Sequence, residues 1–318
     1  MSFSIIGTGM YVPPKIVTND DLSALVDTSD EWIRQRVGVE RRHICTDETA
    51  TDLACKAALN ALENSGCAPE ELDVIIAATV SGDMVSPSVS CMVQRRIGAD
   101  CFAFDINAAC SAFIFMLDTA AGFFERGRVK KALIIGTEQM SKIVDWKDRG
   151  TCVIFGDGAG AVVLEAGEGY IDSVLTTKGG DEVIKIPHFI GKSPYSTQKP
   201  QEPYIFMEGQ ETFKYAVNAM CSDIRKLLSD NNLTADDIAM IVPHQANKRI
   251  IDLAAARLKI PAEKFYVNIQ DYGNTSSASI PIALDELSRA GGLKRGDLII
   301  LTAFGGGLSN ASCIIKWQ

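Results

Sequence analysis

The sequence has no apolar stretch approaching the roughly 18 uncharged residues that a membrane-spanning helix needs. Its first residues carry no basic segment followed by a long apolar run, so we expect no secretory signal. The nine cysteines are an odd number and form no CxxC pair. We therefore expect a cytoplasmic protein with reduced thiols, inserted in no membrane, rather than a disulfide-stabilised one.

Positive charge is also scarce. Lysine and arginine number 31 against 40 aspartates and glutamates, which gives a net charge of −9. This balance argues against nonspecific binding to nucleic acid or to anionic lipid. An acidic protein partner would need a local basic patch on the surface.

Two glycine-rich segments stop short of a nucleotide-binding motif. Neither Gly7-Thr8-Gly9 nor the segment 156–160 completes the six-residue dinucleotide fingerprint, and the second precedes an apolar strand rather than a helix. The cysteines and the three histidines lack the spacing of metal ligands. We expect no nicotinamide site, no metal and no resident cofactor.

The chain does contain an internal repeat. With 318 residues and 47% hydrophobic composition it can bury a large core. A helical pattern followed by an apolar strand occurs twice, and the offset is 166 both for Ile76 with Val242 and for Leu133 with Ile299. Coincidence between two generic α/β halves is the alternative, but the constant offset favours duplication.

Each copy indicates the order β-α-β-α-β-β. Strands that are apolar throughout require a sheet covered on both faces, so we predict an α/β fold of five layers, α/β/α/β/α, with halves at 1–166 and 167–318. Two segments interrupt the repeat. Residues 27–36 should form a surface helix capped by Ser29 or Thr28, and the proline-containing segment 185–204 should be a surface excursion.

Cys110 lies where an apolar strand at 101–106 runs into a helix-like stretch, and the first turn of a helix favours thiolate over thiol. Under the repeat offset Cys110 falls beside Ser276, just after Asn274. A twofold relation between the halves would bring Cys110 and Asn274 together with His244, which ends an apolar strand. One cysteine with a distant histidine and asparagine is typical of thiol-based acyl chemistry.

Structural roles compete with this interpretation. A histidine at a strand end is often only a packing residue, but His43 and His188 lack any comparable context. Asn274 follows Gly273 and suits a simple turn. Other cysteines are interpreted as inert core residues: Cys55, Cys91, Cys101, Cys152, Cys221 and Cys313.

Four ordered motifs carry a resemblance that covers essentially the whole chain. They are Asp-Ile-Asn-Ala-Ala-Cys-Ser-Ala-Phe at 105–113, Pro-His-Gln-Ala-Asn at 243–247, Tyr-Gly-Asn-Thr-Ser at 272–276 and Ala-Phe-Gly-Gly-Gly at 303–307. The chain resembles the thiolase-fold condensing enzymes, and most of all the β-ketoacyl-acyl carrier protein (ACP) synthase III family. The resemblance implies a thiolase-like fold, a homodimer, and an acyltransferase that starts fatty acid synthesis.

In such an enzyme Cys110 takes the acyl group of an acyl-CoA primer, and a decarboxylative Claisen condensation with malonyl-ACP gives 3-oxoacyl-ACP, CO2 and CoA. By the same resemblance the N–H groups of Cys110 and Gly306 form the oxyanion hole. His244 Nε2 and Asn274 Nδ2 stabilise the enolate. Neither acyl-CoA nor malonyl-ACP is a cofactor; both are substrates.

The resemblance also implies three groups of binding residues. Contacts with CoA match Thr28, Trp32, Arg36, Arg149 and Asn247. An ACP-docking patch matches Lys214, Arg249 and Arg257. The acyl pocket matches Phe304 and Ser86. Ser86 stands where a bulky phenylalanine is common, in some members reaching across the dimer interface, so we hypothesise tolerance of primers longer or more branched than acetyl.

The chain departs from the commonest family pattern at Ala112, Leu308, Asn310 and Ala311. It also lacks the second cysteine that a thiolase carries in its C-terminal glycine loop. Three alternatives stay open: a condensing enzyme of secondary metabolism with the same Cys-His-Asn set, an acyltransferase or thioesterase that does not condense, and a catalytically silent scaffold.

Overall fold

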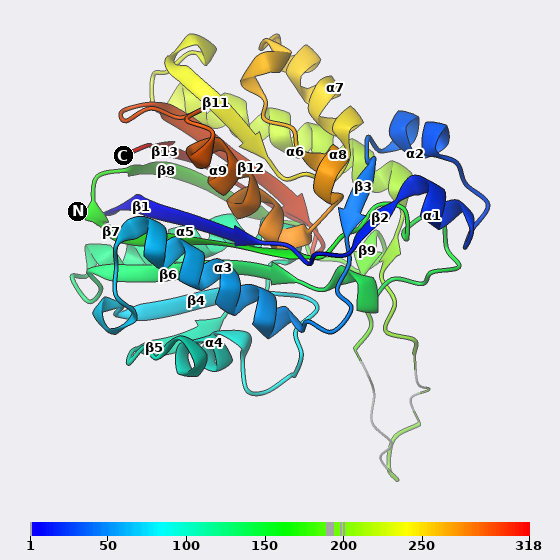
Figure 1. Ribbon diagram of the computed structural model, residues 1–318. Coiled ribbons are helices and arrows are strands. Elements are labelled where there is room, and N and C mark those ends of the chain that lie inside the picture. The colour runs from blue at the N-terminus through cyan, green and yellow to red at the C-terminus, as the bar shows by residue number, and fades with distance from the viewer. Residues whose placement is uncertain (1, 189–193, 198, 200) are drawn as a thin grey trace.

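The computed structural model describes residues 2–188, 194–197, 199 and 201–318 (Figure 1). Much of the predicted excursion at 185–204 lies outside the described residues, and the chain on either side of it forms two short paired strands. In the first half the elements are β1 (Ser2–Tyr11), β2 (Ile16–Thr18), α1 (Asn19–Ser23), α2 (Asp30–Arg36), β3 (Arg41–His43), α3 (Ala50–Ser65), β4 (Val74–Ala78), α4 (Val89–Ile97), β5 (Phe102–Asp105), α5 (Ala112–Glu125), β6 (Lys131–Glu138) and β7 (Gly158–Gly167).

The second half follows directly after β7. Its elements are β8 (Tyr170–Thr177), β9 (Ile184–Lys185), β10 (Phe206–Met207), α6 (Gly209–Asp230), β11 (Ile238–Pro243), α7 (Lys248–Leu258), α8 (Ile269–Tyr272), α9 (Ser279–Arg289), β12 (Leu298–Gly305) and β13 (Ser309–Lys316). No helix in the described part of the chain is long and apolar enough to span a membrane.

Two sheets form the body of the molecule. The first has the order β1-β7-β6-β4-β5, with β4 parallel to β5 and β6 and with β7 antiparallel to β1 and β6. The second has the order β11-β12-β13-β8, with β11 parallel to β12 and with β13 antiparallel to β12 and β8. The two orders correspond strand for strand, except that only an isolated bridge between Ile241 and Phe265 stands where the first sheet has β5.

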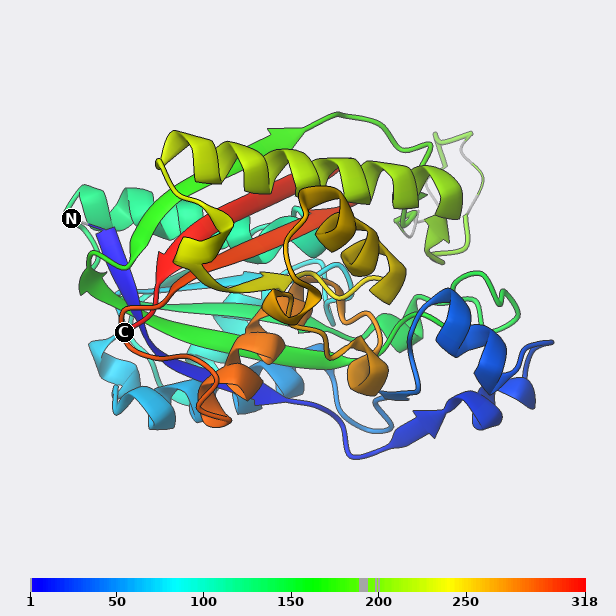
Figure 2. The same cartoon turned by 90° about the horizontal axis from the view of Figure 1, so that it is seen from above.

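Helices cover both faces of each sheet. Figure 1 shows α3 and α4 outside the first sheet and α5 and α9 between the sheets, and Figure 2 shows α6 and α7 across the outer face of the second. Along β4 the side chains alternate: Ile75 belongs to the core under α3 and α4, whereas Ile76 belongs to the central core with α5 and α9. The five-layered α/β/α/β/α arrangement predicted from the sequence is confirmed.

The repeat has one shift that the sequence comparison missed. The short 3₁₀ turns Pro69–Glu71 and Ala235–Asp237 keep the predicted offset of 166, but the turns Ala109–Ser111 and Ser276–Ala278 are 167 apart, because the second half has one more residue before its turn. Ser276 therefore corresponds to Ala109 rather than to Cys110. The backbone agrees, since φ is +48° at Ala109 and +49° at Ser276.

The order β-α-β-α-β-β was also incomplete for both halves, because α4 and β5 precede the turn of Cys110 in the first half and α7 takes the place of α4 in the second. The predicted surface helix at 27–36 is confirmed as α2. It begins after Ser29, whose Oγ accepts the N–H of Trp32 at 3.2 Å.

Candidate active site

Cys110 occupies the 3₁₀ turn between β5 and α5. The positive φ of Ala109 bends the chain there, and Asn107 Oδ1 accepts the Ala109 N–H at 3.2 Å. Ser111 Oγ donates to the Ala108 carbonyl at 2.8 Å and lies 2.9 Å from Ser309 Oγ on β13. We call the turn Ala109–Ser111 the nucleophile elbow; these bonds tie it to the second half of the fold.

Gly305, the last residue of β12, lies against the nucleophile elbow. A β-carbon at this position would come within 2.7 Å of the Cys110 backbone nitrogen. Glycine is therefore required for the backbone of β12 to approach so closely. This contact brings the triple-glycine segment next to Cys110.

His244 follows β11 and is 1% exposed. Its N–H donates to the Thr302 carbonyl at 2.8 Å, and its Nδ1 lies 2.7 Å from Ser279 Oγ at the start of α9. Ser279 Oγ also accepts the Gln245 N–H at 3.4 Å, so its own proton is free to point at Nδ1. With the hydroxyl donating to Nδ1, the ring proton lies on Nε2, and burial lowers the pKa of His244 to about 3, which keeps the imidazole neutral near pH 7.

Asn274 is held by its backbone and by its own side-chain oxygen. Its N–H donates to the Ile154 carbonyl at 2.9 Å, and its carbonyl accepts the Gly156 N–H at 3.1 Å. Its Oδ1 accepts the Ser276 N–H at 2.8 Å. The amide nitrogen Nδ2 is consequently the end left to act as a donor.

Cys110, His244 and Asn274 all line one cavity of about 160 Å³, together with Phe304 and Gly305. The Phe304 ring meets the imidazole edge to face, with centroids 5.4 Å apart. The sequence pattern thus brought together three residues from remote segments. A thiol, a neutral imidazole and a carboxamide share this cavity.

The expectation that Cys110 rests as a thiolate is wrong. Burial raises the pKa of its thiol to about 12, and this effect exceeds any stabilisation of the anion by the turn. The Ser276 hydroxyl works in the opposite direction and lowers the pKa, whereas the carboxyl of Glu138 raises it further. The resting residue is a protonated thiol.

A second cavity, of about 660 Å³, borders the nucleophile elbow at Ala109 and does not include Cys110. Ala109, Gly306 and Phe115 line it, and Ile184 lines both cavities. Gly306, expected in the oxyanion hole, therefore faces the larger cavity. Ser86 lies in an exposed loop and is not among the residues that line either cavity.

Trp32 and Arg149 lie in direct contact. The Arg149 guanidinium carbon is 5.2 Å from the centre of the Trp32 ring, and its Nη1 donates to the Asp27 carbonyl at 2.7 Å. This spacing is that of a cation–π pair and leaves no room for a further ring between the two. Thr28, which shortly precedes Trp32 in the sequence, has a buried Oγ1 with no hydrogen-bond partner in the described part of the chain.

Asn247 joins α7 to the last residue of α2. Its Nδ2 donates to the Arg36 carbonyl at 3.0 Å, and its Oδ1 accepts the Arg249 N–H at 2.9 Å as the cap of α7. Asn247 also lines the smaller cavity. Both ends of its side-chain amide form hydrogen bonds, so Asn247 holds α7 against α2 at the wall of the cavity.

The three basic residues expected to dock a carrier protein are all exposed on α6 and α7. Lys214 pairs with Glu211 at 2.7 Å, Arg249 lies over the Phe213 ring at 5.6 Å, and Arg257 donates to Asn218 at 2.9 Å. Phe213 also lines the smaller cavity. The basic patch therefore borders the wall of the cavity that holds Cys110.

The sequence interpretation missed Ser279 and Glu138. Ser279 begins α9 just as Ala112 begins α5. The corrected offset of 167, applied to Ala112, would therefore have indicated Ser279. Glu138 ends β6 as Gly305 ends β12, by the same offset. A charged residue at the end of an apolar strand was the available signal.

The duplicated five-layered fold, with a cysteine elbow in one half meeting a histidine and an asparagine of the other, is that of the thiolase-fold condensing enzymes. Residues 104–179 match the family described as 3-oxoacyl-[acyl-carrier-protein (ACP)] synthase III, and residues 228–317 match the C-terminal part of the same enzyme. The chain belongs to the β-ketoacyl-ACP synthase III family. The predicted family and enzyme class are confirmed.

Several relatives show how far the similarity extends. A β-ketoacyl-ACP synthase III of Clostridium acetobutylicum is 51% identical, over 99% of each chain. The crystal structure of the 3-oxoacyl-ACP synthase III of Aquifex aeolicus VF5 superimposes with a TM-score of 0.93 at 45% identity, over 99% of this chain and 100% of that one. The priming β-ketosynthase of the R1128 polyketide pathway gives a TM-score of 0.92 at 34% identity, over 99% of this chain and 96% of that one.

Proposed function

We propose that this enzyme condenses an acyl-CoA primer, carried on Cys110, with malonyl-ACP to give 3-oxoacyl-ACP, CO2 and CoA, in the cytoplasm. The observation that carries the proposal is the common cavity lined by Cys110, His244 and Asn274. The reaction uses only these side chains, backbone donors and the two substrates, so it calls for no resident cofactor.

In the first half-reaction the Cys110 sulfur attacks the thioester carbon of acyl-CoA. The bond from carbon to the CoA sulfur breaks, and the thiol proton leaves on CoA. Oxyanion donors would be the N–H groups of Cys110 and Gly306. The close approach of Gly305 to the Cys110 nitrogen supports this role, because it brings the neighbouring backbone next to the nucleophile elbow.

In the second half-reaction malonyl-ACP loses CO2 and forms a thioester enolate, which needs hydrogen-bond donors rather than a base. His244 Nε2 and Asn274 Nδ2 are the proposed donors. The contacts of Ser279 with Nδ1 and of the Ser276 N–H with Asn274 Oδ1 support this assignment, since each leaves the donor atom free. The enolate carbon then attacks the acyl-Cys110 carbonyl and releases the thiol.

Entry of CoA requires a change at its adenine site. With Arg149 over Trp32 at 5.2 Å, an adenine ring can stack between them only after the guanidinium swings away from its bond to Asp27. The unpartnered Thr28 hydroxyl is a free donor for the incoming nucleotide, and Arg36 adds positive charge on the same helix as Trp32. Asn247 would exchange one of its present bonds for the pantetheine arm.

Lys214, Arg249 and Arg257 form the proposed docking patch for acidic ACP. The overall charge of −9 makes such a local patch necessary for attraction between the two proteins. Its position on α6 and α7, next to Phe213 at the cavity wall, supports delivery of the malonyl group to Cys110.

We propose a homodimer that covers the β5 edge of the first sheet. Phe102 on that edge strand and the loop residues Met84 and Val85 are large, apolar and exposed, which suits an interface between copies. Ser86 belongs to the same loop, so its effect on primer size would be exerted on the acyl pocket of the second copy. Phe304 is the acyl-pocket residue within the chain.

A condensing enzyme of secondary metabolism is the second candidate. The similarity to the R1128 priming β-ketosynthase favours it. Acylation rates with acetyl-, isobutyryl- and hexanoyl-CoA distinguish these possibilities. Strict selectivity for acetyl-CoA would contradict the larger-primer hypothesis.

The test of the main proposal combines intact mass with CO2 release. Mixing the enzyme with acetyl-CoA or a larger acyl-CoA should add one acyl group, and Cys110→Ala should remove this adduct. Adding malonyl-ACP should then release CO2 and 3-oxoacyl-ACP. Acyl exchange without CO2 release would indicate a non-condensing acyltransferase, and no adduct at all would indicate a scaffold.

A further inference from the structure

Ser276 carries a buried hydroxyl that no resting-state bond explains. The residue is 1% exposed, and its Oγ has no hydrogen-bond partner within residues 2–188, 194–197, 199 and 201–318. Its backbone N–H is already used by Asn274 Oδ1 at 2.8 Å. An unpaired buried hydroxyl costs free energy, so a native fold that keeps one invites a functional reason.

The place of Ser276 in the fold supplies that reason. It opens the turn Ser276–Ala278, which is the counterpart of the nucleophile elbow and packs directly against it. Burial raises the pKa of the Cys110 thiol and of the Glu138 carboxyl group, and the Ser276 hydroxyl opposes both shifts. The packing of the two turns places this unpartnered hydroxyl at the side of the nucleophile elbow.

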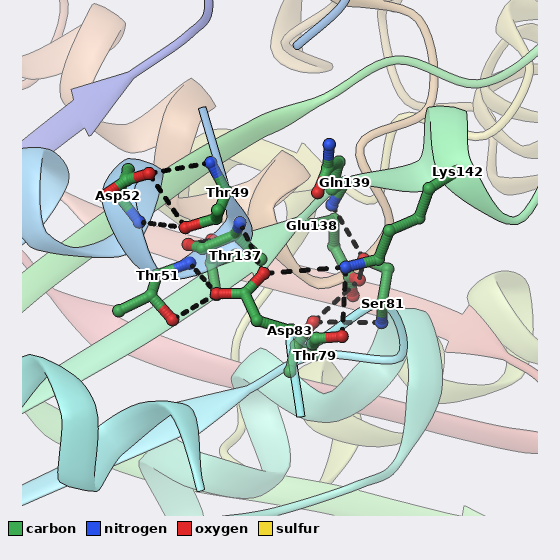
Figure 3. A network of polar contacts seen from close by, with 12 residues as sticks. Thr49, Thr51, Asp52, Thr79, Ser81, Asp83, Thr137, Glu138, Gln139 and Lys142 are labelled. Carbon is green, nitrogen blue, oxygen red and sulfur yellow. Dashed lines mark hydrogen bonds and ion pairs between the residues drawn. The ribbon is translucent and has the colours of Figure 1, made fainter. Parts of the chain in front are cut away.

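Glu138 is 0% exposed and ends β6. Its Oε2 accepts hydrogen bonds from Ser81 Oγ at 2.6 Å, the Val80 N–H at 3.1 Å and Thr79 Oγ1 at 3.2 Å, as Figure 3 shows. Its Oε1 accepts one from Ser277 Oγ at 2.8 Å. Within the described chain Glu138 forms no ion pair, so neutral donors alone hold this carboxyl group.

Among the described residues, two titratable groups bear on the Cys110 sulfur. His244 from the end of β11 lines the same cavity, and Glu138 from the end of β6 raises the pKa of the thiol. The parts of α5, β13 and the turn Ser276–Ala278 that pack against the elbow contribute uncharged side chains. Since His244 is neutral and the described residues lining this cavity include no lysine or arginine, none of them supplies a cation to balance a thiolate.

We propose that Ser276 is a positioning residue for the nucleophile: its hydroxyl donates a hydrogen bond to the Cys110 sulfur when that sulfur becomes negative during attack, and Glu138 opposes the same charge. The inference rests on the proposed role of Cys110 and deepens it. In the balanced step the Cys110 proton leaves on the CoA sulfur, the new carbon–sulfur bond forms as the old one breaks, and Ser276 keeps its proton throughout.

The Ser276 hydroxyl can be removed by a substitution that suits the backbone at this position. Ser276→Gly removes it and suits the positive φ of the site, so the turn need not change. Ser277→Ala is the matched control, because it removes a neighbouring hydroxyl that serves Glu138 but not the sulfur. Glu138→Gln keeps the shape of the carboxyl group and removes its charge. Ser276→Ala is a second deletion if the glycine variant folds poorly.

The readout is the rate of alkylation of Cys110 by iodoacetamide at several pH values between about 7 and about 10, followed on the Cys110 peptide by mass spectrometry, since the rate follows the thiolate fraction. Exposed Cys91 reports reagent quality in the same sample. We expect Ser276→Gly to slow Cys110 alkylation about tenfold at each pH, equivalent to a pKa about one unit higher. Glu138→Gln should speed it, and Ser277→Ala should not slow it.

Equal alkylation rates in wild type and in both folded Ser276 variants would overturn the inference. A slowed rate in Ser277→Ala equal to that in Ser276→Gly would also overturn it, because general loosening of the turn would then explain both. These outcomes are separate from the proposed function, which depends on acyl transfer to Cys110 in the wild-type enzyme. Failure of that transfer leaves the alkylation comparison interpretable.

Discussion

Ser279 holds the imidazole of His244 in one tautomer: its Oγ lies 2.7 Å from Nδ1 while it accepts the backbone N–H of Gln245. The two residues come from different elements, α9 and the end of β11. The proton on Nε2 is therefore set by a helix start in the same half, and the donor for the enolate depends on a residue that never meets substrate.

Ser279→Ala should slow decarboxylation of malonyl-ACP more than acylation. Without the hydroxyl, Nδ1 can take the ring proton and Nε2 loses its donor role. We expect CO2 release to fall on the order of tenfold, less than the roughly hundredfold or greater loss typical when an oxyanion donor itself is removed. Single-turnover acylation by acyl-CoA should stay near the wild-type rate. The exposed Ser222→Ala on α6 is the control, and an equal loss in both half-reactions would contradict this role.

Gly305→Ala should impair acylation of Cys110. The added β-carbon would meet the Cys110 nitrogen at 2.7 Å, so the elbow or β12 must shift. Overpacking of this kind costs roughly 1–3 kcal/mol, and we expect a lower melting temperature and acylation at least about tenfold slower. Gly122→Ala on α5 is the matched control, because nothing lies within 4 Å of its added carbon and alanine favours helices. Normal acylation by Gly305→Ala would argue against the close approach.

The buried imidazole of His244 predicts a pH dependence of stability. Its pKa is about 3 in the folded chain against an ordinary value of 6.5, so below about pH 6.5 the unfolded chain binds a proton that the folded chain refuses. The free energy of unfolding should therefore fall as the pH drops from about 6.5 toward about 3. In His244→Asn this contribution should vanish. Urea unfolding of both proteins across that window measures the difference, and parallel curves would refute the prediction.

Reversal of the basic patch should weaken capture of malonyl-ACP. Lys214→Glu and Arg257→Glu place negative charge opposite an acidic carrier, so we expect a KM for malonyl-ACP several-fold higher at low salt. The difference should shrink as salt rises, because exposed charges are screened. KM for acyl-CoA should not change. Lys226→Glu, which reverses an exposed lysine farther along α6, is the control; equal effects from it would point to net charge rather than docking.

The sequence predicted the layers well because the buried strands are apolar throughout and recur at a nearly constant spacing. It missed α4 in the first half and α7 in the second, because both helices are short and their starts do not keep the predicted offset. The one-residue shift at Ser276 was hidden for a related reason. The turns Ala109–Ser111 and Ser276–Ala278 have no apolar periodicity that could align them in the sequence. Only their backbone angles show that Ser276 corresponds to Ala109.

The candidate site could be assembled from motifs, but its electrostatics could not. The strand-to-helix position of Cys110 suggested a thiolate, whereas burial by distant elements sets the thiol pKa at about 12. Glu138 and Ser279 are remote in sequence from the groups they affect. Local sequence reveals which residues turn the chain, and only the packed structure reveals which carboxyl group or hydroxyl lies beside them.

The two elbows of this fold differ in what stands opposite them. Gly305 lies so close to the turn of Cys110 that no side chain fits between them, whereas Glu138, at the equivalent strand end, accepts a hydrogen bond from Ser277. A nucleophile transplanted to Ser277 would thus meet a carboxyl group instead of a substrate. At this pair of strand ends the two halves have diverged, so that glycine lies against the turn that carries the nucleophile and a carboxyl group lies against the turn that carries none.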